Sequence, residues 1–280
     1  MNIFVTGSTG LVGSHFVRLA LENGHNVYAL RRTLDSQPRI SLKKHPNWIT
    51  KRLDQLDSND FKGIDIFIHL AAHSMTPPYD TYQNCLYWNL YAPINACCEA
   101  VNMGINNFLV AGSCFEYGKT GEEVDFIPTQ AELKPTNTYA SSKALSSSAF
   151  EQFSTLHKVA VTYLRIFHVY GEGEAETRLW PSLEKAALSG DDFPMTKGEQ
   201  VRDFMEVSEV AKCFLNEAEQ LVNSKKKESQ FLVKNLGSGY PQSILEFSQH
   251  WWSKWQAKGK LLVGALPYRE GEVMRYVPKI

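Results

Sequence analysis

The sequence predicts an α/β fold, in which a doubly wound, mainly parallel sheet is followed by a smaller C-terminal lobe. Short β-prone apolar runs alternate with stretches long enough for helices, and a glycine-rich turn joins the first run to the first helical pattern. Such alternation indicates a parallel sheet covered by helices on both faces. Because crossovers between parallel strands are right-handed, the doubly wound arrangement is the simplest topology.

The chain begins with a strand, a turn and a helix. Residues 3–5 form a β-prone run that stops at Gly7, and apolar residues then recur at helical spacing over 11–20. The helix should end near Asn23-Gly24, where glycine can adopt the left-handed cap conformation. Residues 27–30 predict the second strand, which completes a βαβ unit.

The rest of the chain divides into two parts. Further strands are predicted at 64–70, 107–111, 160–166 and 231–234, with helices near 83–103 and 138–157. From residue 171 onward glycine, proline and charged residues are frequent. We therefore expect a first domain over 1–170 and mainly a smaller lobe over 171–280, of which about 205–236 returns to the first core. The Lys225-Lys226-Lys227 run is interpreted as a solvated helix end or loop.

Composition excludes several classes of protein. The chain has 280 residues, and 29 Lys and Arg stand against 30 Asp and Glu, so no basic surplus is available for a nucleic acid. Five cysteines without zinc-site spacing predict reduced thiols and no metal. No apolar stretch reaches the roughly 18 to 20 residues of a membrane span, and no secretory signal opens the chain. We expect a soluble cytoplasmic protein.

The turn after the first strand has the sequence Gly7-Ser-Thr-Gly10-Leu-Val-Gly13. Main-chain N–H groups and the positive end of the following helix can hold a pyrophosphate there. The spacing is G-x-x-G-x-x-G rather than G-x-G-x-x-G, so the dinucleotide interpretation depends on placement as well as on pattern. A purely structural turn is the alternative.

A second motif is Tyr139-Ala-Ser-Ser-Lys143, the only Tyr-x-x-x-Lys in the chain. On a helix this spacing places the phenol and the ammonium on one face. About one such match is expected by chance, so the position has to support the motif. It opens the helix that follows the strand ending in Ala111-Gly-Ser113, whose carboxyl end lies at the ligand-binding edge of such a sheet.

Together these motifs resemble the extended short-chain dehydrogenase/reductase family, and within it the enzymes that modify nucleotide-activated sugars. The resemblance implies a Rossmann-type dinucleotide-binding domain over 1–170 and a substrate-binding lobe after it. The 4-keto reductases that complete deoxyhexose nucleotides look most similar. Further matching segments are His69-Leu-Ala-Ala72, Asn89-Leu-Tyr-Ala, Pro135-Thr-Asn-Thr-Tyr139, Leu164-Arg-Ile-Phe-His-Val-Tyr-Gly171, Gln200-Val-Arg202-Asp203-Phe204 and Tyr268-Arg269-Glu-Gly-Glu272.

The family implies catalytic roles for three residues. Tyr139 would exchange a proton with the sugar hydroxyl or carbonyl, Ser113 would hydrogen-bond the same oxygen, and Lys143 would hold the cofactor ribose. A nearby ammonium stabilises a tyrosinate and so lowers the pKa of a phenol from about 10 toward neutrality.

The resemblance also implies binding residues. The expected cofactor-binding residues are Gly7, Thr9, Gly10, Leu11, Val12, Gly13, Arg31, Arg32, Asp54, Gln55, Leu70, Ala71, Ala72, Asn89, Tyr139, Lys143 and His168. The expected substrate-binding residues are His73, Ser113, Arg178, Arg202 and Arg269. The three arginines would contact a diphosphate, whose geometry suits a guanidinium. For each arginine a surface ion pair is the alternative, and for His168 the alternative is a half-buried histidine with a backbone partner.

Departures from the family pattern select among its activities. The 4,6-dehydratases of the family that this chain resembles have Asp and Glu where this chain has Cys114 and Phe115. Dehydration is therefore not expected. Dual 3,5-epimerase/4-reductases carry Cys and His where Phe115 and Arg178 stand, and Cys114 is interpreted as a buried apolar residue. Reduction of a 4-keto-sugar nucleotide and 4-epimerisation both stay open.

The cofactor separates these two reactions. Arg31-Arg32 follows the second strand, and no acidic residue stands where NAD enzymes hold the ribose 2′-hydroxyl. We therefore expect NADP(H), with NAD(H) as the alternative, and hence NADPH-dependent 4-keto reduction rather than an NAD-dependent 4-epimerase. A non-catalytic dinucleotide-binding protein with a regulatory or interaction role is the alternative from another class.

A homodimer is also expected. The resemblance implies pairing of the helices near 83–103 and 138–157, and Leu86, Leu90, Ile94 and Cys97 recur at helical spacing. Packing within one subunit would explain the same stripe.

Overall fold

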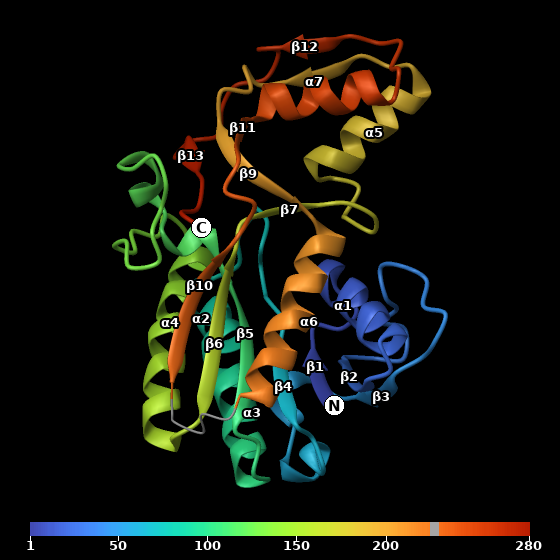
Figure 1. Ribbon diagram of the computed structural model, residues 1–280. Coiled ribbons are helices and arrows are strands. Elements are labelled where there is room, and N and C mark those ends of the chain that lie inside the picture. Colours follow the sequence, from blue (N-terminus) through green and yellow to red (C-terminus); the bar gives the residue numbers. More distant parts are fainter. Residues whose placement is uncertain (225–229) are drawn as a thin grey trace.

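A seven-stranded parallel sheet forms the centre of the molecule, which confirms the predicted fold class (Figure 1). The computed structural model describes residues 1–224 and 230–280, so the Lys225-Lys226-Lys227 run lies outside the described residues. The strand order is β10-β6-β5-β4-β1-β2-β3. The strands are β1 (Asn2–Thr6), β2 (Asn26–Arg31), β3 (Asn47–Thr50), β4 (Ile66–His69), β5 (Asn107–Ser113), β6 (Ala160–Ile166) and β10 (Phe231–Leu236).

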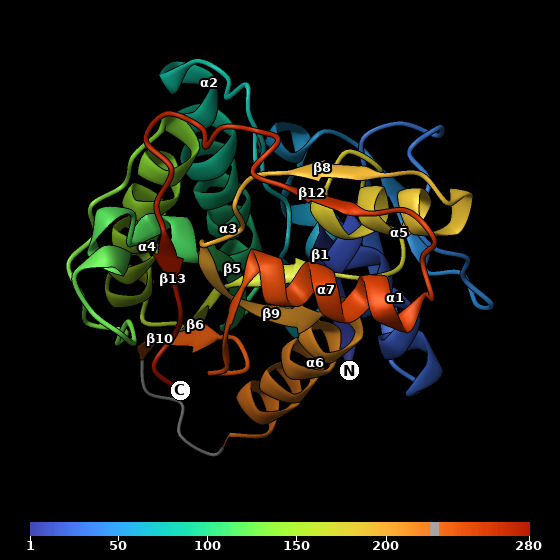
Figure 2. The same cartoon turned by 90° about the horizontal axis from the view of Figure 1, so that it is seen from above.

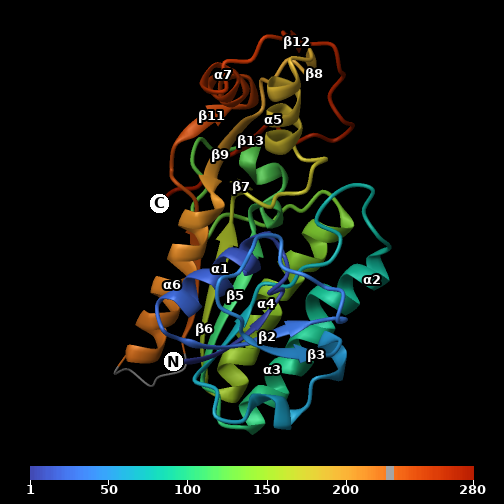
Figure 3. The same ribbon diagram turned by 90° about the vertical axis from the view of Figure 1, so that its right-hand side faces the viewer.

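Helices cover both faces of this sheet (Figure 3). One face packs against α1 (Leu11–Glu22) and α6 (Val207–Asn223), and the other packs against α3 (Ala92–Asn102) and α4 (Thr138–His157). All four residues of β4 are buried. A strand buried on both sides reads as a continuous apolar run, which explains why alternation was absent from the sequence.

A second group of elements lies beyond the carboxyl ends of the main sheet (Figure 1), and it lies in front of that sheet in the view from above (Figure 2). Its strands form a four-stranded and a two-stranded sheet. They are β7 (His168–Tyr170), β9 (Val201–Glu206), β11 (Pro241–Ser243) and β13 (Arg275–Tyr276), and the pair β8 (Phe193–Met195) and β12 (Leu261–Val263). Helices α5 (Leu179–Ser189) and α7 (Ile244–Lys254) pack together through a cluster of aromatic rings from Tyr170, Trp180, Phe247, Trp251 and Trp255.

The chain passes between the two groups more than once. After β9 it returns to the main sheet, where α6 packs beside α1 and β10 pairs with β6. The last residues then run back as β13, beside β9, and Val277 accepts a hydrogen bond from the Ile127 main chain. Tyr276 and Ile127 are buried in one cluster with Cys114 and Tyr117. The C-terminal strand therefore closes over the end of β5.

Some elements differ from expectation. The predicted helix near 83–103 consists of α2 (Tyr82–Leu86), a π-helical turn over Tyr87–Tyr91 and α3. Strand β3 and the short strands after residue 166 were not predicted. Short 3₁₀ turns complete the connections at Leu53–Gln55, Ser58–Phe61, Cys114–Glu116 and Lys119–Glu122.

Two further findings concern cysteines and membranes. All five cysteines are free thiols, and Cys97 is fully buried in the core between the sheet, α3 and α4. Assigning Cys97 to a dimer-forming stripe was therefore wrong, because it packs inside the subunit. None of the helices in the described residues is long and apolar enough to cross a membrane.

Candidate active site

The glycine turn lies where β1 meets α1. Gly7 has φ +68°, and a Cβ at this position would lie 2.5 Å from the main-chain nitrogen of Ala71. A Cβ on Gly13 would lie 2.0 Å from the Gly7 carbonyl oxygen. The glycines therefore let the turn, the helix and the segment after β4 approach closely.

The same turn leaves the start of α1 open to an anion. Its N-cap is Gly10, which has no side chain with which to cap the first N–H groups. A helix N-terminus carries a partial positive charge, and its free N–H groups bind phosphate. The turn therefore fits a pyrophosphate, while the cofactor contacts of Thr9, Leu11 and Val12 stay predictions.

Ser113, Tyr139 and Lys143 come together at the carboxyl end of β5. Ser113 ends the strand, and the interaction of its side chain with Tyr139, from the first turn of α4, acts to lower the pKa of that phenol. Lys143 lies one turn further along α4 and donates from Nζ to the Ala111 carbonyl oxygen at 2.7 Å. Asn137 caps α4 through its side chain and so fixes where the helix begins. The structure thus joins the two motifs that the sequence analysis placed side by side.

Burial changes the ionisation of both helix residues. It raises the pKa of Tyr139 well above the usual value, against which the hydrogen bond to Ser113 acts, so the phenol is protonated at neutral pH. Burial lowers the pKa of Lys143 to about 8, against which the charge of Glu116 acts. The site therefore places a transferable proton one helical turn from a buried ammonium.

Two histidines near this site are neutral. The Nδ1 atom of His69 lies 2.7 Å from Thr6 Oγ1, and burial lowers the pKa of this histidine to about 3. Burial, followed by the charge of Arg202, lowers the pKa of His168 well below its usual range. The Nδ1 atom of His168 is buried without a hydrogen-bond partner among the described residues, so the expected backbone partner is not seen at that atom. Neither ring is charged at neutral pH.

Aromatic rings surround the Tyr139 phenol. The Tyr79 ring is parallel to that of Tyr139, with the centroids 6.5 Å apart, and the Phe115 ring stands edge-on at 6.3 Å. Tyr276, from the C-terminal strand, packs edge-on against Phe115 at 5.4 Å. Cys114 is buried, and burial raises the pKa of its thiol. Positions 114 and 115 thus supply neither an acid nor a base beside the site, as expected.

The sequence analysis missed Tyr79 and Tyr276. Tyr79 lies in the connection after β4, and the main-chain oxygen of the next residue, Asp80, accepts a hydrogen bond from Thr138 Oγ1 at 2.9 Å. This bond holds the connection against the first turn of α4. A tyrosine in a long connection carries no pattern that would have revealed the contact.

Arg202 is held by its own chain. It is buried, its Nη2 atom contacts Glu272 Oε1 at 3.0 Å, and it also donates to the Val273 carbonyl oxygen at 2.6 Å. Its guanidinium lies 5.3 Å from the centroid of the Tyr276 ring. A surface ion pair is therefore not what the structure shows, and the phosphate contact of Arg202 stays a prediction.

Arg178 and Arg269 face one region. Arg178, the N-cap of α5, pairs with Glu174 at 3.3 Å, and Arg269 is exposed. Both charges act to lower the pKa of the Tyr79 phenol, which burial raises. Both charges thus act on the phenol whose ring lies parallel to Tyr139, and the phosphate contacts of the two arginines stay predictions.

Asn89 and His73, which were both predicted to lie in the binding site, are joined by a hydrogen bond. The side chain of Asn89 accepts the His73 main-chain N–H at 2.7 Å and donates to Ser142 Oγ at 2.9 Å. His73 Nε2 lies 2.7 Å from Asp80 Oδ2. Asn89 therefore links the segment after β4 to α4, which positions Leu70, Ala71 and Ala72 at the edge of the sheet.

The predicted adenosine end is occupied by internal contacts. Arg31 donates from Nε to Thr50 Oγ1 at 3.0 Å and lies 5.0 Å from the centroid of the Trp48 ring, whereas Arg32 is exposed. Asp54 pairs with Arg52 at 2.7 Å. The Gln55 side chain accepts the Arg52 main-chain N–H at 3.2 Å.

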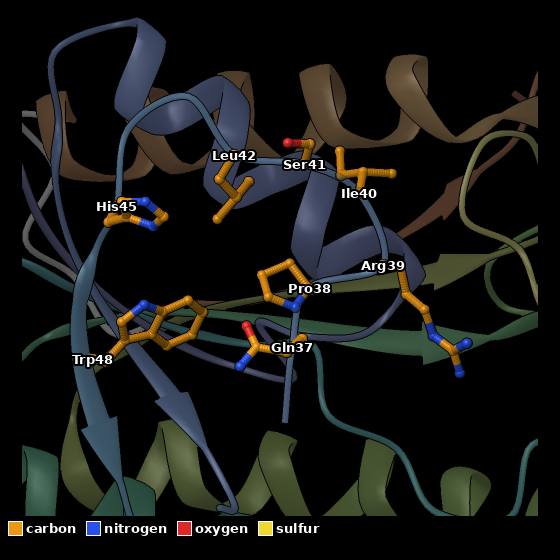
Figure 4. Close-up of a pocket in the computed structure, with 8 residues that line it drawn as sticks. All are labelled: Gln37, Pro38, Arg39, Ile40, Ser41, Leu42, His45 and Trp48. Atoms are coloured by element: carbon orange, nitrogen blue, oxygen red, sulfur yellow. The ribbon is translucent and has the colours of Figure 1, made fainter. Parts of the chain in front are cut away.

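A pocket of about 380 Å³ lies beneath the connection between β2 and β3 (Figure 4). Its lining residues are Gln37, Pro38, Arg39, Ile40, Ser41, Leu42, His45 and Trp48. None of them was predicted to bind a ligand. The pocket borders the predicted adenosine end, because Trp48 lines the pocket and the Arg31 guanidinium lies over the Trp48 ring.

Comparison with known proteins identifies the family. The model of the NAD dependent epimerase/dehydratase family matches residues 3–233. The chain belongs to this family. The resemblance to extended short-chain dehydrogenases that modify nucleotide sugars is thereby confirmed.

Individual relatives are distant. The chain is 28% identical to a UDP-glucose 4-epimerase of Yersinia enterocolitica over 88% of this chain and 80% of the relative. It is 27% identical to a UDP-glucose 4-epimerase of Corynebacterium glutamicum over 87% of this chain and 77% of the relative. The structure of a UDP-N-acetylglucosamine 4-epimerase from Methanobrevibacter ruminantium matches with a TM-score of 0.87 at 23% identity, over 100% of this chain and 89% of that one. The last likeness shows the shared fold.

The buried lysine makes a prediction about stability. Because the folded-state pKa of Lys143 lies near 8 and the ordinary value is 10.5, burying its charge costs up to about 3 kcal/mol at pH 7. The unfolded chain binds this proton more tightly, so the cost shrinks as the pH rises from about 8 toward 10.5. We expect Lys143→Met to raise the free energy of unfolding at pH 7, with a smaller gain at alkaline pH.

Urea unfolding at the two pH values measures this effect. Lys62→Met is the matched control, because Lys62 is exposed and should leave the free energy of unfolding unchanged. A Lys143→Met protein that is less stable than the wild type at pH 7 would contradict the argument.

Proposed function

We propose that the chain catalyses NAD(P)-dependent hydride transfer at C4 of a nucleotide-activated 6-deoxy-hexose. The observation that supports this most is that Ser113, Tyr139 and the buried Lys143 lie together at the carboxyl end of β5, where Lys143 Nζ donates to the Ala111 carbonyl oxygen. A bound nicotinamide dinucleotide would supply or accept the hydride, and the glycine turn fits its pyrophosphate.

The side chains divide the remaining chemistry. In the direction of reduction, Tyr139 donates its phenolic proton to the C4 oxygen while Ser113 hydrogen-bonds that oxygen. The C4 carbonyl gains one hydride and one proton and becomes an alcohol. Lys143 stabilises the tyrosinate that results, until solvent returns the proton. In the direction of oxidation, the Tyr139 tyrosinate removes the proton of the C4 hydroxyl group.

Two net reactions share this step. NADPH-dependent reduction of a 4-keto sugar is favoured by Arg31 and Arg32 at the end of β2, where a 2′-phosphate would find two positive charges. NAD-dependent 4-epimerisation is the second candidate, and it is favoured by the UDP-glucose 4-epimerases among the relatives. A regulatory role without catalysis is disfavoured because Ser113, Tyr139 and Lys143 are assembled.

The proton transfer predicts the effects of two substitutions. Tyr139→Phe keeps the ring packing and removes the transferable proton, so turnover should be lost while cofactor affinity and thermal stability stay near the wild-type values. Ser113→Ala removes one hydrogen bond to the reacting oxygen, which should cost about 2 to 4 kcal/mol of transition-state stabilisation. Steady-state kinetics measure the turnover of both variants, a fluorescence titration measures cofactor affinity, and thermal unfolding measures stability. Tyr240→Phe is the control, because Tyr240 is exposed. Wild-type rates in Tyr139→Phe would exclude the mechanism.

The net reaction predicts how the two cofactors are used. Purified protein should oxidise NADPH when given a nucleotide 4-keto-6-deoxy-hexose, with kcat/KM higher than for NADH. In Arg31→Ala, Arg32→Ala the preference should fall about tenfold, because charge-assisted contacts to the 2′-phosphate are lost. Lys43→Ala, which removes an exposed cation from the same connection outside the pocket, is the matched control. Interconversion of nucleotide hexoses at C4 with retained NAD and no net consumption would instead establish the 4-epimerase.

A homodimer through α3 and α4 is part of the proposal. Tyr87 and Tyr91 lie on the π-helical turn that leads into α3 and are 38% and 61% exposed, and Leu145 lies on α4 and is 45% exposed. Large apolar side chains on neighbouring helices fit a self-complementary interface. Sedimentation at micromolar concentration should give a dimer, and Tyr91→Lys with Leu145→Glu should give a monomer. A wild-type monomer would exclude the dimer and leave the enzymology untouched.

A further inference from the structure

Glu116 is a fully buried carboxylate that the proposed mechanism does not use. Its Oε1 atom accepts the Ser113 main-chain N–H at 2.8 Å and the Tyr163 hydroxyl at 3.0 Å. Its Oε2 atom accepts from Arg165 Nε at 2.7 Å. Three donors thus point at one carboxylate, and the first of them belongs to the residue beside Tyr139.

These partners connect the end of β5 to α4. The Tyr163 hydroxyl lies 3.2 Å from the Lys143 carbonyl oxygen, and Arg165 donates from Nη2 to Ser147 Oγ at 3.2 Å. Both contacts fall on the helix that carries Tyr139 and Lys143. The carboxylate therefore lies at the junction between the strand that supplies Ser113 and the helix that supplies the acid.

The strand leaves space for this junction. A Cβ on Gly112 would lie 2.3 Å from a ring carbon of Tyr163 and 2.8 Å from Glu116 Oε1. Any larger residue would push the Tyr163 ring and the carboxylate away from β5. Gly112 is thus needed for the contact between Tyr163 and Glu116.

We propose that Glu116 is a positioning residue of the active site, which fixes the Ser113 main chain against α4 and supplies the negative charge of the buried network around Lys143. The kinetic part of this inference depends on the function proposed above, and the structural part does not.

Glu116 is the electrostatic partner of Lys143, because the other titratable groups that face Lys143 are neutral. His69 from β4 and Tyr163 from β6 face Lys143 and are neutral, because burial lowers the pKa of this histidine to about 3 and raises that of this tyrosine. Tyr139, on the same helix, is protonated. Arg165 lies on the far side of the carboxylate and pairs with it. Glu116 alone acts to raise the pKa of Lys143, so its removal should lower that pKa further.

A buried ion pair that serves only the fold is the competing interpretation. Breaking such a pair costs stability whatever its neighbours do. A structural role therefore predicts a loss of stability without any change in the titration of Lys143.

Glu116→Gln separates the two interpretations. The amide oxygen can still accept from Ser113 and Tyr163, while the charge is lost. The pH titration of the Lys143 Cε carbon resonance, followed by NMR on the free protein and assigned with Lys143→Arg, should shift down by about one pH unit. With substrate present, kcat should fall more than KM rises.

Tyr117→Phe is the matched control. Its hydroxyl accepts from Arg165 Nη1 at 2.9 Å and donates to Asn235 at 2.6 Å, so it belongs to the same buried network. Within the part of the chain that the structure describes, this hydroxyl makes no hydrogen bond to Ser113 or Lys143. We expect lower stability and an unchanged Lys143 titration.

A second variant covers the case in which Glu116→Gln does not fold. Tyr163→Phe keeps the ion pair and removes the hydroxyl between Glu116 and the Lys143 carbonyl, so kcat should fall several-fold at constant KM. An unchanged Lys143 titration in folded Glu116→Gln overturns the proposal, as does an unchanged kcat in Tyr163→Phe. If the wild type has no activity, the proposed function fails, while the titration of Lys143 still tests Glu116.

Discussion

The complete burial of the Lys143 ammonium is the constraint around which the site is arranged. A buried cation is stable only when its donors are satisfied and a negative charge lies nearby. The Ala111 carbonyl accepts one hydrogen bond from Nζ, and the Tyr163 ring lies 5.8 Å from it. Glu116 supplies the opposite charge. These partners come from two neighbouring strands and the turn that follows one of them, so the ammonium depends on the correct pairing of β5 with β6.

Burial also decides which neighbours can be charged. A low-dielectric environment penalises every isolated charge, so His69 and His168 are neutral and Tyr139 keeps its proton. The proposed proton exchange therefore uses the phenol, although histidine is the commoner acid at neutral pH. The hydrogen bond to Ser113 acts on Tyr139 in the opposite direction from burial, which makes the phenol easier to ionise than burial alone would.

The sequence predicted those parts of the molecule that depend on local pattern. The glycine turn, the Tyr139–Lys143 spacing and six strands of the main sheet each follow from neighbouring residues. Strand β3 was missed because its four residues at the edge of the sheet carry no apolar run. The contacts of Tyr79 and Tyr276 with the site were missed because long connections bring them there. Glu272, the partner of Arg202, lies 70 residues later in the chain, a distance that no local pattern spans.

Two of the three arginines predicted to bind substrate already have partners, and this shapes how an anion would bind. Arg202 is buried against Glu272, and Arg178 contacts Glu174. The Arg202 guanidinium is buried and would be costly without its carboxylate, whereas the Arg178 side chain is 40% exposed, so the pair with Glu272 holds Arg202 in place before any ligand arrives. A diphosphate bound there would take over hydrogen bonds that a carboxylate now accepts, and the net gain would be smaller than that of a free arginine. Selectivity at such a site depends more on the placement of the guanidinium groups than on their number.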